Sequence, residues 1–148
     1  MKLQTRTFGE IEINDSEIIT FKEGLPGFPD DRRFVLLAED DSPICFLQSA
    51  DDGDTSFVLV DMTELAGNSY DPLVDESALA AFGDYNPADL LIYNICTLHG
   101  DLQKSTVNLK APVVIDSAKK IGRQIVCANE EYSVKAAVFA EAGARGDV

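Results

Sequence analysis

The chain reads EIITFKEGLPGFPD from Glu17 to Asp30, a short β-type run followed by a loop with two glycines and two prolines. Each proline holds its own φ near about −65° and favours extended geometry at the residue before it, whereas glycine adopts angles that other residues rarely reach. We therefore predict a strand over 17–21 and a rigid loop from which Leu25 and Phe28 project. Two interpretations are open: these side chains fill the core behind a tight connection, or the loop, with Pro26 and Gly27, forms a docking surface.

The alternation of β runs and turns continues on both sides of this loop. Residues 2–13 alternate with a period of two and contain a bend at Gly9, which predicts a hairpin or a bent strand. Runs rich in β-branched or aromatic residues, separated by Asp, Gly, Pro or Asn, predict further strands at 33–37, 44–49, 56–61, 90–98, 105–109, 113–115, 123–127 and 132–138. This spacing is typical of an all-β fold, mainly an antiparallel barrel or a barrel-like sandwich.

One segment departs from the β pattern. It begins at a candidate N-cap, Asp75, continues with strong helix formers and ends at Gly83. We predict a short helix there and one tight turn over 86–89. Residues 1–138 are then expected to form a single domain, and 139–148, which lack apolar periodicity, a flexible C-terminal tail.

Charge and hydropathy argue against nucleic-acid binding, secretion and membrane insertion. The 148 residues include 26 acidic and 12 basic side chains, which give a formal net charge of −14. Such a charge repels a nucleic-acid backbone and attracts a basic protein partner, although simple solubility is the plainer explanation. We expect no direct binding of nucleic acid. The N-terminus lacks the apolar core of a secretion signal and no run approaches the roughly 20 apolar residues of a membrane span, so we expect a cytoplasmic protein without membrane contact.

Few residues suggest catalysis. His99, the single histidine, lies in a predicted hairpin loop, and the chain has no nucleophile elbow, phosphate-binding loop or paired metal-binding histidines. The acidic clusters 39–41 and 51–54 lack the spacing of a calcium loop and are interpreted as solvated turns. Cys45, Cys96 and Cys127 lie in strand-like runs without CxxC spacing, which predicts buried, reduced thiols. We expect that the protein is not an enzyme and binds no metal or cofactor. The alternative is a small-molecule-binding barrel or an unrecognised hydrolase.

Three polar residues stand in apolar surroundings. Gln48 and Asn108 either point outward or satisfy backbone groups at an irregularity of a strand, and we favour the second interpretation. Lys110, close to Pro112, is typical of an edge strand that is protected against pairing. Together with the loop residues Leu25, Pro26, Gly27 and Phe28, the residues Gln48, Asn108 and Lys110 are also kept as candidates for partner binding.

Several segments together resemble one family, the bacterial flagellar assembly factor FliW. The segments are FGEIEI (8–13), ITF (19–21), GLPGF (24–28), FLQS (46–49), FVLVD (57–61), VNLKAPVVI (107–115), GRQ (122–124) and Tyr132, and the resemblance covers roughly residues 3–135. The sequence departs from the family where we expect proline, at Lys22 and Met62, and at Cys45 and Asp116, where we expect an aromatic residue and asparagine.

The resemblance implies a function that composition and spacing do not show. FliW-like proteins are expected to be non-enzymatic cytoplasmic regulators with two protein partners, flagellin and the RNA-binding translational repressor CsrA. Free flagellin occupies the regulator; once flagellin is exported, the released regulator captures CsrA and relieves repression of flagellin translation. A purely structural part of the flagellum is a further alternative, against which the absence of an export signal argues.

Overall fold

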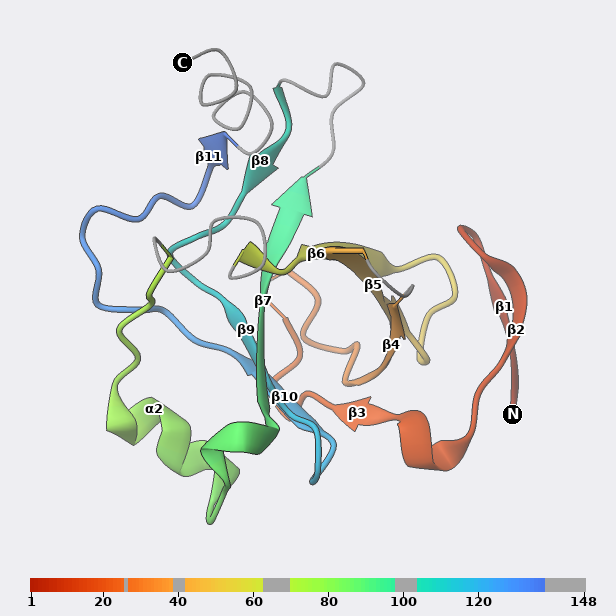
Figure 1. The fold of residues 1–148 in the computed structure, drawn as a ribbon. Helices are drawn as coiled ribbons and strands as arrows, with labels where there is room; N and C mark the ends of the chain where they lie inside the picture. The colour runs from red at the N-terminus through yellow and green to blue at the C-terminus, as the bar shows by residue number, and fades with distance from the viewer. Residues whose placement is uncertain (26, 39–41, 63–69, 98–103, 138–148) are drawn as a thin grey trace.

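The computed structural model describes residues 1–137 except 26, 39–41, 63–69 and 98–103. The predicted tail, His99, Pro26 and the acidic cluster 39–41 therefore lie wholly or partly outside the described residues. Strands dominate the fold (Figure 1): β1 Lys2–Thr5, β2 Gly9–Glu12, β3 Ile19–Thr20, β4 Arg33–Ala38, β5 Ile44–Ser49, β6 Ser56–Val60, β7 Leu90–Thr97, β8 Thr106–Val107, β9 Val113–Asp116, β10 Ile121–Gln124 and β11 Ala136–Ala137.

Seven of these strands close into a barrel. Their order is β3-β4-β5-β6-β7-β9-β10, and β10 returns to β3. All neighbours are antiparallel except β10 and β3, which are parallel and joined through the single pair Ile121 and Thr20. The predicted mainly antiparallel barrel is confirmed, and its closure depends on one very short seam.

Strand β7 holds the barrel together because it has different neighbours along its length. Residues 90–93 pair with β9, residues 94–96 pair with β6, and Cys96 and Thr97 pair with β8. β8 and β9 both pair with the same side of β7. The connection 108–112 between them bulges away from β7 in the stretch between these two pairings. This bulge forms part of the site described below.

The β1–β2 hairpin stands beside the barrel (Figure 1). Gly9 follows its turn with a φ of +68°, which glycine adopts without strain and which confirms the predicted bend. The hairpin contacts the β5–β6 turn, where the amide of Arg6 donates to the carbonyl of Gly53 at 3.0 Å. A Cβ at Gly53 would lie 1.9 Å from the carbonyl oxygen of Gln4, so this close approach requires glycine.

The barrel interior is filled by apolar side chains from most of its strands. Phe21 and Phe34 are fully buried, with ring centroids 5.2 Å apart in an edge-to-face arrangement. The same cluster contains Ile19, Leu25, Cys45, Leu47, Leu59, Val113 and Ile115. All three cysteines are buried free thiols, and burial together with the nearby charge of Asp61 raises the pKa of Cys45 to about 11.

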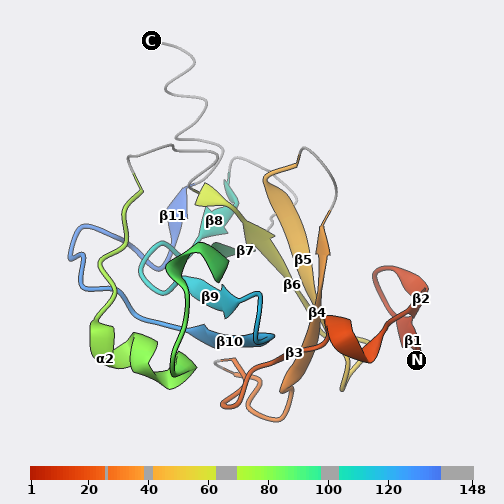
Figure 2. The same ribbon diagram turned by 60° about the horizontal axis from the view of Figure 1, so that its bottom comes forward.

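A helical segment covers one outer face of the barrel (Figure 2). The helix α2, Glu76–Leu79, continues into a 3-10 turn at Ala80–Phe82, and the Asp75 side chain accepts a hydrogen bond from the amide of Ser77. Gly83 ends it with a φ of +68°. Phe82, Val114 and Ile125 form the apolar layer beneath. The predicted helix is confirmed, as is the tight turn, a 3-10 helix at Pro87–Asp89.

Four strand predictions are wrong in extent by two residues or more. The strand expected at 17–21 is β3, at 19–20, because Asp15–Glu17 form a 3-10 helix. The strand expected at 105–109 covers only β8, because the carbonyls of Asn108 and Leu109 accept hydrogen bonds from the side chains of Asn94 and Tyr70. The strand expected at 123–127 is β10, at 121–124. Among the described residues, the strand expected at 132–138 forms only at β11. Tyr132 lies outside it and packs against Tyr70, and its hydroxyl accepts from the amide of Asp71. In the described part of the chain, no helix is long and apolar enough to cross a membrane.

Candidate functional site

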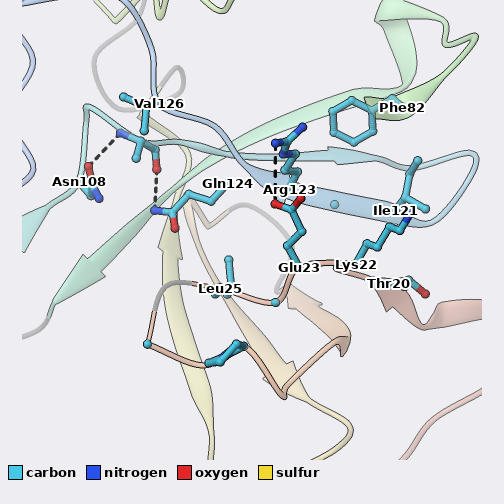
Figure 3. A pocket seen from close by; sticks show the side chains of 15 residues that line it. Thr20, Lys22, Glu23, Leu25, Phe82, Asn108, Ile121, Arg123, Gln124 and Val126 are labelled. Atoms are coloured by element: carbon cyan, nitrogen blue, oxygen red, sulfur yellow. Dashed lines mark hydrogen bonds and ion pairs between the residues drawn. The ribbon is translucent and has the colours of Figure 1, made fainter. Parts of the chain in front are cut away.

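An apolar groove of about 680 Å³ opens where the loop after β3 separates from β10 (Figure 3). One wall is the glycine- and proline-rich loop, and the other is β10 with the bulge 108–112. Phe82 of the helical segment lies at one end. The lining residues are Thr20, Lys22, Glu23, Gly24, Leu25, Gly27, Pro29, Phe82, Asn108, Ala111, Ile121, Gly122, Arg123, Gln124 and Val126.

The loop is rigid because its backbone bonds to itself. The amide of Phe28 donates to the carbonyl of Leu25 at 2.8 Å, and the amide of Leu25 donates to the carbonyl of Phe28 at 3.4 Å. Gly24 and Gly27 have φ of +67° and +85°. A Cβ at Gly24 would also lie 2.6 Å from the carbonyl oxygen of Phe28. The loop therefore keeps its shape without help from β10, as the two prolines and glycines predicted.

The two apolar side chains of the loop have different roles. Leu25 is 2% exposed and belongs to the core cluster, so for this residue the core interpretation is confirmed. Phe28 is 40% exposed and packs edge-on against Phe57, with centroids 5.2 Å apart. Its ring lies on the outer surface, beside the groove lining and not among it. The loop thus both plugs the core and presents an aromatic ring to solvent.

Two amide side chains shape the opposite wall by holding Ala111 from both sides. The amide of Ala111 donates to the Asn108 Oδ1 at 3.0 Å, and the Gln124 Nε2 donates to the Ala111 carbonyl at 3.0 Å (Figure 3). Asn108 therefore satisfies backbone at an irregularity, as predicted, and it also lines the groove.

A buried polar network supports this bulge from behind. The Asn94 Nδ2 donates to the Tyr70 hydroxyl at 2.8 Å and to the carbonyl of Asn108 at 2.9 Å. The Tyr70 hydroxyl donates to the carbonyl of Leu109 at 2.9 Å. Burial raises the pKa of Tyr70 to about 12, against a smaller lowering by the Asn94 hydrogen bond, so the hydroxyl stays protonated as a donor. Sequence reasoning missed Asn94, although it is a polar residue inside an apolar run, the signal that identified Gln48 and Asn108.

Gln48 and Lys110 lie outside the groove lining. Gln48 is fully buried on β5, and the two N–H groups of its Nε2 are shared among the carbonyls of Ser49, Gly53 and Thr55, all within 3.3 Å, so it organises the β5–β6 turn. Lys110 lies in the connection between β8 and β9, and its Nζ donates to the carbonyl of Asn129 at 2.7 Å. The edge-strand interpretation of Lys110 is wrong, because its own carbonyl accepts from the amide of Cys127.

The charged lining residues are Lys22, Glu23 and Arg123. Arg123 of β10 and Glu23 of the loop meet with 3.8 Å between Nη2 and Oε2, and both side chains are substantially exposed. Such a surface pair contributes about 0–1 kcal/mol and opens readily. Among the described residues, no group of three or more His, Cys, Asp and Glu side chains could hold a metal ion. The groove offers apolar contact and backbone groups, which suit a peptide segment or an apolar small molecule.

Two of the expected departures from the family have clear places in the structure. Lys22 lines the groove, where the family is expected to have proline. Asp116 is buried in the turn from β9 to β10, and its Oδ1 accepts from the amides of Ala118 and Lys119 at 3.1 Å. An asparagine Oδ1 accepts the same two bonds, so this departure preserves the turn.

Comparison with known proteins agrees with the fold. The family model described as FliW protein matches residues 2–138. The flagellar assembly factor FliW of Natranaerobius thermophilus is 38% identical over 152 aligned positions that cover all of both chains. That of Desulfitobacterium hafniense is 38% identical, covering 99% of this chain and 96% of its own. A crystal structure of the flagellar assembly factor FliW superposes with a TM-score of 0.83 at 31% identity, covering 93% of this chain and 96% of the other. The chain therefore belongs to the FliW family of flagellar assembly factors.

Proposed function

We propose that this protein is a non-enzymatic cytoplasmic regulator that binds flagellin and CsrA in turn. Flagellin occupies it while unassembled subunits accumulate. When flagellin is exported, the free protein binds CsrA and relieves repression of flagellin translation. The proposal takes the flagellar role from family membership and the partners from the resemblance described above.

The observation that best supports a flagellin site is the apolar groove beside the rigid loop. Flagellin's terminal segments are disordered and amphipathic before assembly, and such segments bind to apolar grooves or open sheet edges. The loop is preorganised by its own hydrogen bonds, which lowers the entropic cost of binding. Leu25, Gly27 and Asn108 line the groove, and the exposed ring of Phe28 extends the surface beside it.

The net charge of −14 supports CsrA as the second partner. A protein that binds RNA phosphates carries a positive surface, and an acidic partner is attracted to that surface. Once bound, the acidic protein also repels RNA, so it need not cover the RNA site itself. Charge thus favours CsrA, whereas apolar contact favours flagellin.

Calorimetric titration tests both partners. The purified protein is titrated with CsrA, with monomeric flagellin, and with CsrA after saturation by flagellin. Partner switching predicts binding to each alone and greatly reduced CsrA binding to the flagellin complex. Simultaneous binding of both would contradict switching, binding of flagellin alone would make the protein a chaperone, and binding of neither would refute the proposal.

The groove volume favours one alternative, a small-molecule site. Ligand pockets commonly have volumes of roughly 300–1,000 Å³, and this groove falls in that range at about 680 Å³. A thermal-shift screen distinguishes the two, because a ligand that binds only the folded protein raises its Tm. A specific small-molecule hit that flagellin displaces would show that the groove serves both.

A further inference from the structure

The outer edge of β10 faces the groove, as the alternation of hydrogen bonds along this strand shows. In an antiparallel ladder every second residue bonds to the partner strand, and the residues between point their backbone groups the other way. Here the amide of Ile125 donates to the carbonyl of Pro112 at 2.9 Å, and that of Cys127 donates to the carbonyl of Lys110 at 2.8 Å. Val126, which lies between them, and Gln124, which precedes Ile125, therefore direct their amides and carbonyls away from β9.

This outer edge is closed at both ends and open in the middle. At one end the carbonyl of Lys120 accepts from the amide of Thr20 at 2.9 Å, and at the other the amide of Ala128 donates to the carbonyl of Leu73 at 2.8 Å. Between these points, within the described part of the chain, the backbone groups of Gln124 and Val126 have no hydrogen-bond partner. Val126 is also 68% exposed. The unpaired backbone groups of such an open edge can form hydrogen bonds to an additional strand.

The groove runs along this open edge. Its lining includes the four consecutive residues Ile121–Gln124, which alternate between the two faces of β10, and then Val126. A groove that touches both faces of one strand must lie at the edge of that strand. Figure 3 shows the loop with Leu25 across the gap from β10. Because the loop bonds to itself, it leaves the edge of β10 unpaired.

The charges at the groove indicate which partner fits. Its lining has two cations, Lys22 and Arg123, and one carboxylate, Glu23, in a molecule whose net charge is −14. This net positive lining repels a basic surface such as that of CsrA. A neutral or acidic segment with apolar side chains is complementary to this groove.

We propose that an extended terminal segment of flagellin adds to the outer edge of β10 as an extra strand. Its backbone bonds to the amides and carbonyls of Gln124 and Val126, and its inward side chains enter the groove between Leu25 and Phe82. The inference rests on the proposed binding of flagellin and specifies its geometry. In this mode main-chain bonds supply affinity and alternate side chains supply specificity.

Amide hydrogen exchange, followed by NMR, tests the geometry on the wild-type protein with and without full-length monomeric flagellin. Strand addition predicts that exchange at the amides of Gln124 and Val126 slows at least tenfold in the complex. If flagellin binds and both amides exchange at an unchanged rate, the strand-addition proposal is overturned while the proposed function stands. If flagellin does not bind at all, the proposed function fails and this inference fails with it.

A pair of variants isolates the backbone contribution. Val126→Pro removes an amide that faces the groove, whereas Val126→Ala removes most of the side chain and keeps that amide. We expect flagellin binding to weaken about tenfold more in V126P than in V126A, as the loss of one backbone hydrogen bond implies. Equal affinities of the two variants would contradict the proposal. A circular dichroism melt checks that V126P is folded, and the exchange measurement decides the question if it is not.

Discussion

Gly122 lies on β10 directly against the ring of Phe21. A Cβ at this position would lie 2.5 Å from the Phe21 Cζ, and the ring is fully buried and packed on Phe34. Alanine normally stabilises a strand relative to glycine, but overpacking of a fixed ring opposes this and costs about 1–3 kcal/mol. The sequence shows a glycine in a strand, and only the packed structure shows which atoms require it.

We therefore predict that Gly122→Ala lowers the free energy of unfolding by about 1–3 kcal/mol, measured by urea denaturation. Ala118→Ser is the control, because its side chain is exposed in the turn after β9 and such a change alters stability by no more than about 0.5 kcal/mol. Wild-type stability of the Gly122→Ala protein would show that the Phe21 ring has room to move.

At the scale of an element, the loop after β3 has one side chain that packs in the core and one that lies on the surface, and substitutions can test the two separately. Leu25 is buried in the barrel core and Phe28 is exposed. Leu25→Ala is expected to cost about 2–5 kcal/mol of unfolding free energy, whereas Phe28→Ala loses mainly an aromatic contact worth about 0.5–1.5 kcal/mol.

If the exposed Phe28 ring is part of the binding surface, Phe28→Ala affects flagellin affinity more than it affects stability. Phe28→Ala should bind flagellin more weakly while its Tm stays close to that of the wild type, and calorimetry with a thermal melt measures both. A large fall in Tm with Phe28→Ala would mean that the ring is a core plug, despite its exposure. Unchanged affinity would remove Phe28 from the proposed surface.

The start of β4 and the β5–β6 turn are joined by Asp51. Partial burial raises its pKa, but hydrogen bonds from the amides of Arg32 and Arg33 and from the Arg33 side chain outweigh this, so the pKa lies below its usual 3.8. A carboxyl whose pKa is lowered by folding stabilises the protein above its unfolded pKa, and this contribution disappears as the pH falls through the folded pKa.

Asp51→Asn should therefore reduce the Tm at pH 7 and make the Tm less dependent on pH below about 4. Thermal melts of both proteins from pH 7 to pH 2.5 check this. Asp54→Asn is the matched control in the same turn, since the Asp54 carboxyl is exposed and only its amide is engaged, by the Asp52 side chain. Parallel pH curves for the wild type and Asp51→Asn would contradict the assigned role.

At the scale of the whole molecule, local patterns predicted the elements and the barrel, but not its seam. Period-two alternation identified the hairpin with Gly9, and an N-cap with a terminal glycine identified the helix, because these signals lie within a few neighbouring residues. The parallel pairing of β3 with β10 joins Thr20 to Ile121 through one residue pair. Nothing in either segment alone specifies that contact, and the groove opens beyond this short seam, between the loop after β3 and β10.

The charge of the whole molecule leads to the last prediction. Long-range attraction between this acidic protein and a basic partner extends about 30 Å at 0.01 M ionic strength and about 8 Å at 0.15 M. We therefore expect CsrA affinity to fall markedly between these two conditions, mainly through a slower association rate, whereas flagellin affinity, which depends on apolar contact and backbone bonds, changes little. Stopped-flow and calorimetric titrations at both salt concentrations measure this, with flagellin as the internal control. Salt-insensitive CsrA binding would show that the net charge of −14 serves solubility and does not guide this encounter.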